Sequence, residues 1–160
     1  MSGNNVMKFE ETITNVLKGS TQKNALDFAA FLKANEMTAE EGQDHGGTVT
    51  YKGNILAYMH MDGKAEMPGP WTIWPDVSGT VPEGFELDDE MKEIAWAHIN
   101  ICGSCGGDCA PGSRKSVYGK EFDNVCGALL AFTDPNPNDL ECLKSLLQLI
   151  KHDVSSAGKS

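Results

Sequence analysis

Four cysteines lie close together in this chain of 160 residues, with two, three and sixteen residues between successive members of the group. Thiolates are strong zinc ligands, and four of them form a closed tetrahedral site. Gly103, Gly106 and Gly107 separate the first three cysteines and permit the tight turns that would bring the sulfur atoms onto one ion. The sequence therefore predicts one metal site, with zinc as the expected ion, formed by Cys102, Cys105, Cys109 and Cys126.

Other chemistries stay open for these cysteines. An iron–sulfur cluster also uses four thiolates, although this spacing differs from the compact ferredoxin motif. A redox pair at Cys102 and Cys105 is favoured at a helix N-terminus, whereas this pair follows a predicted helix C-terminus. A catalytic zinc commonly has three protein ligands, so four cysteines favour a structural ion. His98 or Asp108 could replace or support a sulfur, but His98 is more typical of an apolar helix face.

A second group of candidate residues lies on two predicted strands. Because side chains alternate along a strand, Tyr58 and His60 share one face of residues 55–61, and residues 71–74 add two tryptophans. Aromatic walls around a titratable group are typical of a ligand pocket, although core packing explains two tryptophans equally well. The residues of this predicted pocket are Tyr58, His60, Trp71 and Trp74.

Three basic side chains stand within seven positions of an otherwise acidic protein, whose formal net charge is −10. The contrast predicts either a local anion site or a solvated surface. The three residues are Arg114, Lys115 and Lys120.

The acidic composition argues against nucleic-acid binding, because affinity for phosphate backbones depends on lysine and arginine. No apolar run approaches the roughly 20 residues that cross a bilayer, so we expect a small molecule or a protein as the partner. The first residues lack a charged and then apolar leader, which favours the cytoplasm. In that reducing compartment an odd number of cysteines indicates metal or redox chemistry, while Cys142, outside the cluster, is expected to be a small buried residue.

Apolar periodicity and turn residues predict the elements that position these groups. Helices are expected over residues 7–18, 20–35, about 88–98 and from 136 onward, and the third helix is expected to deliver Cys102. A hairpin is expected with Gly53-Asn54 as its turn, and a strand bounded by prolines at or near a sheet edge. The predicted strands are 48–52, 55–61, 71–74 and 125–132, and the predicted loops are 36–47, 76–87 and 110–125.

The predicted order is two helices, three strands, a helix, the four-cysteine loop, a strand and a final helix. Such an order indicates an α+β fold with a small, mostly antiparallel sheet covered by helices. The length fits a single domain over residues 1–160, with residues 1–6 and 154–160 expected to be frayed.

The motifs CGSCGGDCAPG and GKEFDNVC, together with VTYKGNILAYMHM and PGPWTIW, carry a resemblance. The chain resembles an uncharacterised bacterial family of small α+β domains that have a YKG hairpin, a tryptophan strand and a four-cysteine loop, sometimes within larger regulatory proteins. The resemblance covers roughly residues 25–152 and implies the same fold order and a bound metal, but no reaction.

The sequence is interpreted as a cytoplasmic zinc-binding domain whose metal is structural and whose role is ligand binding or regulation. The alternative is an enzyme that uses the metal, or His60 with a nearby carboxylate such as Asp62, for hydrolytic or redox chemistry. A third interpretation is an iron–sulfur protein.

Overall fold

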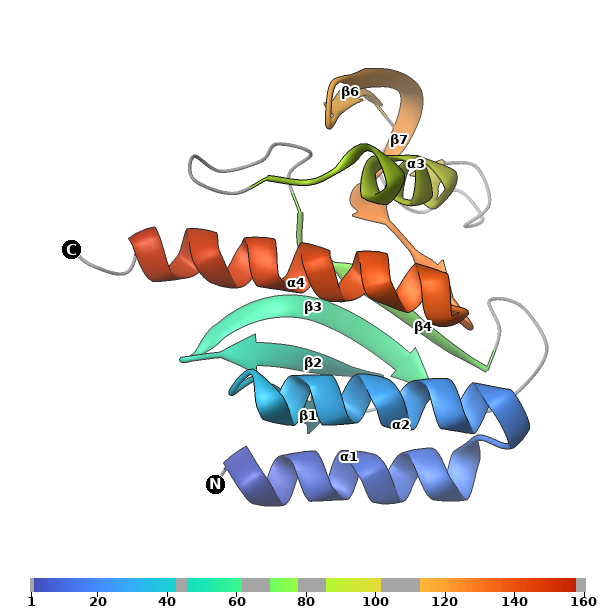
Figure 1. The fold of residues 1–160 in the computed structure, drawn as a ribbon, viewed down its shortest axis with the longest axis vertical. Helices are drawn as coiled ribbons and strands as arrows, with labels where there is room; N and C mark the ends of the chain where they lie inside the picture. Colours follow the sequence, from blue (N-terminus) through green and yellow to red (C-terminus); the bar gives the residue numbers. More distant parts are fainter. Residues whose placement is uncertain (1, 43–45, 62–69, 78–85, 102–112, 158–160) are drawn as a thin grey trace.

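The protein has an α+β fold, as predicted, and the computed structural model describes residues 2–42, 46–61, 70–77, 86–101 and 113–157 (Figure 1). Its helices are α1 (Ser2–Val16), α2 (Gly19–Ala34), α3 (Asp89–Ala97) and α4 (Pro137–Ala157). The main sheet contains β1 (Thr38–Glu41), β2 (Gly46–Tyr51), β3 (Asn54–Met61), β4 (Trp71–Pro75) and β8 (Phe132–Thr133), in that order. A second sheet has the order β5 (Ile99–Ile101), β7 (Lys120–Leu130) and β6 (Ser113–Val117).

Every pairing in the main sheet is antiparallel, so directly opposed residues point to the same face. One face is apolar and helix-covered; its register pairs include Ala39 with Val49, Met59 with Ile73, and Met61 with Trp71. We call the opposite side the Tyr58 face, and it carries Glu40, Thr48, Tyr58, His60, Thr72 and Trp74.

The predicted β2–β3 hairpin is confirmed, but its turn lies one residue earlier than expected. Lys52 and Gly53 have φ values of 50° and 83°, and two successive positive φ values are what a two-residue hairpin turn of the favoured twist requires. Asn54 begins β3 instead, and its side-chain amide donates hydrogen bonds to the carbonyls of Tyr51 and Lys52. The Asn54 side chain therefore stabilises the turn, although Asn54 is not one of the two turn residues.

Helices α1, α2 and α4 pack along the apolar sheet face. Figure 1 shows these three helices running roughly along the direction of β2 and β3, while α3 packs on α4. The predicted stripe of α2 is buried, and the ring of Phe28 lies 5.8 Å from that of Trp71. The predicted stripe of α4 is buried too, and consists of Leu140, Leu143, Leu147 and Ile150. Helix α1 begins at Ser2 and α4 ends at Ala157, so both include residues that were expected to be frayed.

Two segments predicted as loops contain strands. Residues 36–47 include β1, whose sequence is TAEE. Ala39 is its single buried position, so the strand lacks an apolar alternation that would have predicted it. The segment 110–125 contains β6, the turn at Tyr118 and Gly119, and the start of β7. This hairpin is mostly exposed and charged, so it lacks the apolar alternation that identifies a half-buried strand.

Strand β7 joins the two sheets. The predicted strand 125–132 is divided: β7 ends at Leu130, and after Ala131 the chain enters β8, which pairs with β4. The prediction that β4 lies at or near a sheet edge is confirmed, because among the described strands the two-residue β8 alone lies beyond it.

Candidate functional site

The four-cysteine region is only partly within the described residues. Cys102, Cys105 and Cys109 lie outside them, as do Asp108 and the side chain of Cys126, although the backbone of Cys126 belongs to β7. Within the described part of the chain, no group of three or more His, Cys, Asp or Glu side chains is placed to hold a metal.

The described residues on either side of this region converge on one point of the second sheet. Ile101, which precedes Cys102 in sequence, pairs with Val125, which precedes Cys126. Ser113, where the chain re-enters the sheet, pairs with the same Val125 from β6. Ile101 and Ser113, the described residues that precede and follow segment 102–112, therefore flank the strand that carries Cys126.

A strand, rather than the predicted helix, leads to Cys102. Helix α3 ends at Ala97 because His98 leaves helical geometry, and Ile99 then pairs with Leu130 in β5. The β-branched Ile99 and Ile101 suit a strand. The prediction that Cys102 follows directly on a helix C-terminus argued against a redox pair at Cys102 and Cys105. Because β5 lies between α3 and Cys102, that argument no longer applies.

His98 is held by protein groups through both ring nitrogens. Its Nδ1 lies 2.9 Å from the carbonyl oxygen of Ile94, and its Nε2 lies 3.6 Å from Oδ2 of Asp139. The imidazole stacks on Phe132 with a centroid separation of 4.4 Å. His98 was expected on the apolar face of the helix; it instead follows the last residue of α3, and its side chain joins α3 to β8 and α4.

The predicted aromatic pocket is divided between the two faces of the main sheet. Tyr58 is directly opposite Trp74, and His60 is opposite Thr72, so Tyr58, His60 and Trp74 share the Tyr58 face. Trp71 points to the apolar face, where it is fully buried. Tyr58 is 49% exposed, so the Tyr58 face of β3 is open to solvent at that position. Asp62, the carboxylate suggested to work with His60, lies outside the described residues.

The three basic residues do not form one cluster. Arg114 points to one face of the β6–β7 hairpin, where its Nε lies 2.7 Å from Oε1 of Glu121. Lys115 and Lys120 lie on the other face, since they occupy the alternate positions in register with Phe122 and Val117. Lys120 Nζ lies 5.2 Å from the Trp96 ring centroid and 5.5 Å from that of Phe122. Arg114 therefore has an acidic partner on the hairpin, and Lys120 has aromatic partners on the hairpin and on α3.

Cys142 is buried in α4, as predicted, and its thiol donates to the carbonyl of Met91 at 3.3 Å. Burial, followed by the charges of Asp139 and Asp88, raises the pKa of this thiol to about 12. Tyr118 is buried as well, and burial raises its pKa above the usual value of 10.0. Both groups therefore stay protonated at neutral pH and suit packing better than nucleophilic chemistry.

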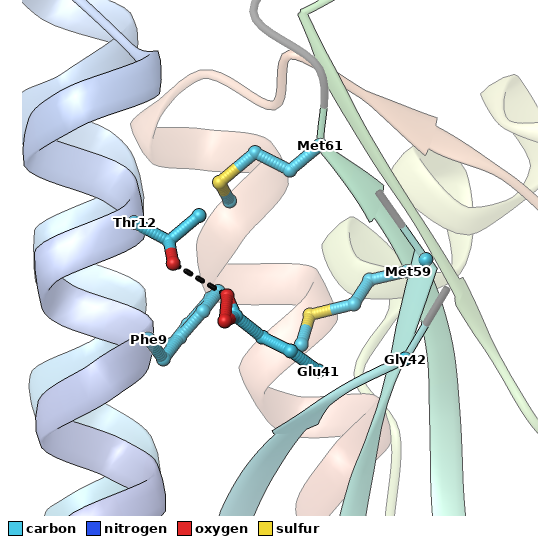
Figure 2. Close-up of a pocket in the computed structure, with 7 residues that line it drawn as sticks. Phe9, Thr12, Glu41, Gly42, Met59 and Met61 are labelled. Atoms are coloured by element: carbon cyan, nitrogen blue, oxygen red, sulfur yellow. Dashed lines mark hydrogen bonds between the residues drawn. The ribbon is translucent and has the colours of Figure 1, made fainter. Parts of the chain in front are cut away.

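A cavity between α1 and the main sheet was not predicted. It has a volume of about 220 Å³ and is lined by Phe9, Thr12, Glu41, Gly42, Gly46, Met59 and Met61. Figure 2 shows the two methionine side chains extending from β3 toward α1, and Thr12 pointing from α1 to the Glu41 carboxylate. The alternation of Met59 and Met61 with Tyr58 and His60 was the only sequence signal, because Glu41 lay in a predicted loop.

Comparison with known protein-family models, with curated protein sequences and with solved structures finds no match to the chain. The resemblance to a family with a four-cysteine loop therefore stays a prediction. Among the described helices, none combines the length and apolar character that crossing a bilayer requires.

Proposed function

We propose that the protein is a zinc-binding α+β domain in which one structural ion, held by Cys102, Cys105, Cys109 and Cys126, ties the connection between β5 and β6 to β7, and whose role is ligand binding or regulation. The observation that supports this most is the convergence of Ile101, Ser113 and Val125. Residues far apart in sequence then approach one point, as a shared ion requires.

Covalent geometry supports this reasoning. Consecutive Cα atoms are about 3.8 Å apart, so Cys102 stays close to Ile101 and Cys126 stays close to Val125. Paired Cα atoms of an antiparallel ladder are about 4.5–5.5 Å apart. The first and fourth cysteines are thus attached to neighbouring backbone positions, and the other two lie in a segment whose described ends flank the same strand.

A structural role follows from the energies involved. Zinc binding to a small structural site is worth roughly 10–16 kcal/mol in apparent free energy, whereas a whole domain is stabilised by about 5–15 kcal/mol. The second sheet has three strands, of which β6 is mostly exposed. An ion that joins β7 to the connection between β5 and β6 adds a stabilisation of this size to the sheet.

The test is elemental analysis of the purified protein combined with two matched substitutions. Cys126→Ser removes one proposed ligand, and Cys142→Ser changes a buried cysteine that bonds Met91. We expect about one zinc per chain in the wild type and in Cys142→Ser, and none in Cys126→Ser. Iron with visible absorbance would support the iron–sulfur alternative, and absence of metal with a reversible disulfide would support a redox pair.

For the ligand-binding role, the Tyr58 face offers the candidate surface. Tyr58 is exposed beside Trp74 and Thr48, which gives an aromatic, partly polar surface on the sheet. A small molecule or a protein is the expected partner, in a reducing compartment such as the cytoplasm, where the cysteines stay available for metal. Ligand-dependent emission of Trp74 without turnover would distinguish this role from an enzyme.

A further inference from the structure

The cavity between α1 and the main sheet lies at the far end of the molecule from the β6–β7 hairpin (Figure 1). Its walls are the Phe9 ring and the side chains of Met59 and Met61, each nearly buried. Methionine side chains are flexible and polarisable, so they adapt to ligands of different shape. These walls favour an apolar ligand body.

The polar side chains that line this cavity are Thr12 and Glu41, and their free hydrogen-bonding capacity is that of an acceptor. The Thr12 hydroxyl donates to Oε2 of Glu41, and the Gly42 amide donates to the Gly46 carbonyl at 2.7 Å, so both donors are already used. In the part of the chain that the structure describes, no lysine, arginine or histidine lies within ion-pair distance of Glu41. Oε1 of the carboxylate remains for a ligand that donates hydrogen bonds.

We propose that this cavity binds a small primary amine, whose ammonium group bonds the Glu41 carboxylate and whose apolar part lies against Phe9, Met59 and Met61. A cavity of roughly 150 Å³ accepts a benzene-sized molecule, and this one measures about 220 Å³. The net charge of −10 adds an attraction for cations over anions. The proposal is independent of the zinc site, because no cysteine takes part.

Thr12 has a positioning role in this proposal. Its hydroxyl holds one carboxylate oxygen of Glu41 across the gap between α1 and β1 (Figure 2), which orients the other oxygen. The matched residue is Glu40, the preceding carboxylate, which points to the Tyr58 face and accepts a hydrogen bond from Thr50 at 3.1 Å. Glu40 thus has the same chemistry on the same strand, but cannot reach the cavity.

The test uses benzylamine, with benzyl alcohol as a neutral isostere and benzoate as an anion, added to full-length protein labelled with ¹³C at the methionine methyl groups. Met59→Leu and Met61→Leu assign the two signals from the cavity. We expect saturable benzylamine-dependent shifts at these two methyl groups, with binding about three- to tenfold tighter than that of benzyl alcohol, as a partly solvated ionic hydrogen bond provides.

Glu41→Gln keeps an acceptor for Thr12 and removes the charge, so it should abolish the preference for benzylamine over benzyl alcohol. Glu40→Gln should leave that preference unchanged. Equal binding of the two isosteres by the wild type, an equal effect of both glutamine variants, or no saturable shift of either methyl signal would each overturn the proposal. The comparison of isosteres on the wild type decides the matter even if Glu41→Gln folds poorly. Zinc content is measured on the same samples, so failure of this proposal is separate from failure of the zinc site.

Discussion

Gly47→Ala tests the close packing of β1, β2 and β3 at the cavity. A Cβ atom at Gly47 would lie 2.7 Å from the carbonyl oxygen of Glu40 and 3.2 Å from Cε of Met59. The methionine methyl group can move aside, but the carbonyl belongs to the backbone of β1, so the β1–β2 pairing must shift.

The expected size of the effect comes from two opposing contributions. Overpacking of this kind costs about 1–3 kcal/mol, while replacing glycine by alanine restricts the unfolded chain and returns about 0.4–1 kcal/mol. The midpoints of these two ranges give a net loss of about 1.3 kcal/mol, which for a chain of this length lowers the melting temperature by roughly 3–5 °C. Differential scanning calorimetry and urea unfolding measure it.

Gly42→Ala is the matched control for this substitution. Its Cβ would lie 3.6 Å from the Gly46 carbonyl oxygen, which is an ordinary van der Waals contact. We expect this variant to be as stable as the wild type or slightly more stable. Equal stability of Gly47→Ala and the wild type, or equal losses in the two variants, would refute the described spacing of the three strands.

Two further predictions concern the Cys142 thiol and the N-cap of α3. Burial raises the pKa of Cys142 from 9.0 to about 12, so as the pH rises the thiol of the unfolded state loses its proton before that of the folded state. The free energy of unfolding should therefore fall between about pH 9 and pH 12. Cys142→Ala should lessen this fall, as measured by urea titrations. An unchanged alkaline slope would contradict the burial of the thiol. Asp88→Ala removes the side chain that accepts from the Met91 amide at 2.8 Å and should cost about 1 kcal/mol, whereas the neighbouring Asp89→Ala, which makes no such cap, should cost less.

The parts of the fold that follow an apolar period could be predicted from sequence. The stripes Ala25–Leu32 and Leu140–Ile150 are buried as their spacing indicates, because each residue faces the same sheet. The hairpin at Lys52 and Gly53 was also recognisable from its glycine and asparagine. Local spacing indicates these features, although the turn lies one residue earlier than predicted.

Features that depend on long-range pairing were missed. Strand β1 has only Ala39 as an apolar signal, and it forms because β2 and α1 lie beside it. The cavity needs Thr12 and Glu41, which are 29 residues apart and show no shared pattern. The division of Trp71 from Trp74 followed from strand alternation, whereas which of them faces the helices depended on the packing of Phe28.

The most direct test of the zinc proposal is the metal content of the purified protein, measured by emission spectroscopy on the wild type, Cys126→Ser and Cys142→Ser. We expect about one zinc per chain in the wild type and in Cys142→Ser, and no zinc in Cys126→Ser. A wild-type protein that folds without metal, or one that keeps its zinc after Cys126→Ser, would contradict the assignment of the four cysteines to one structural site.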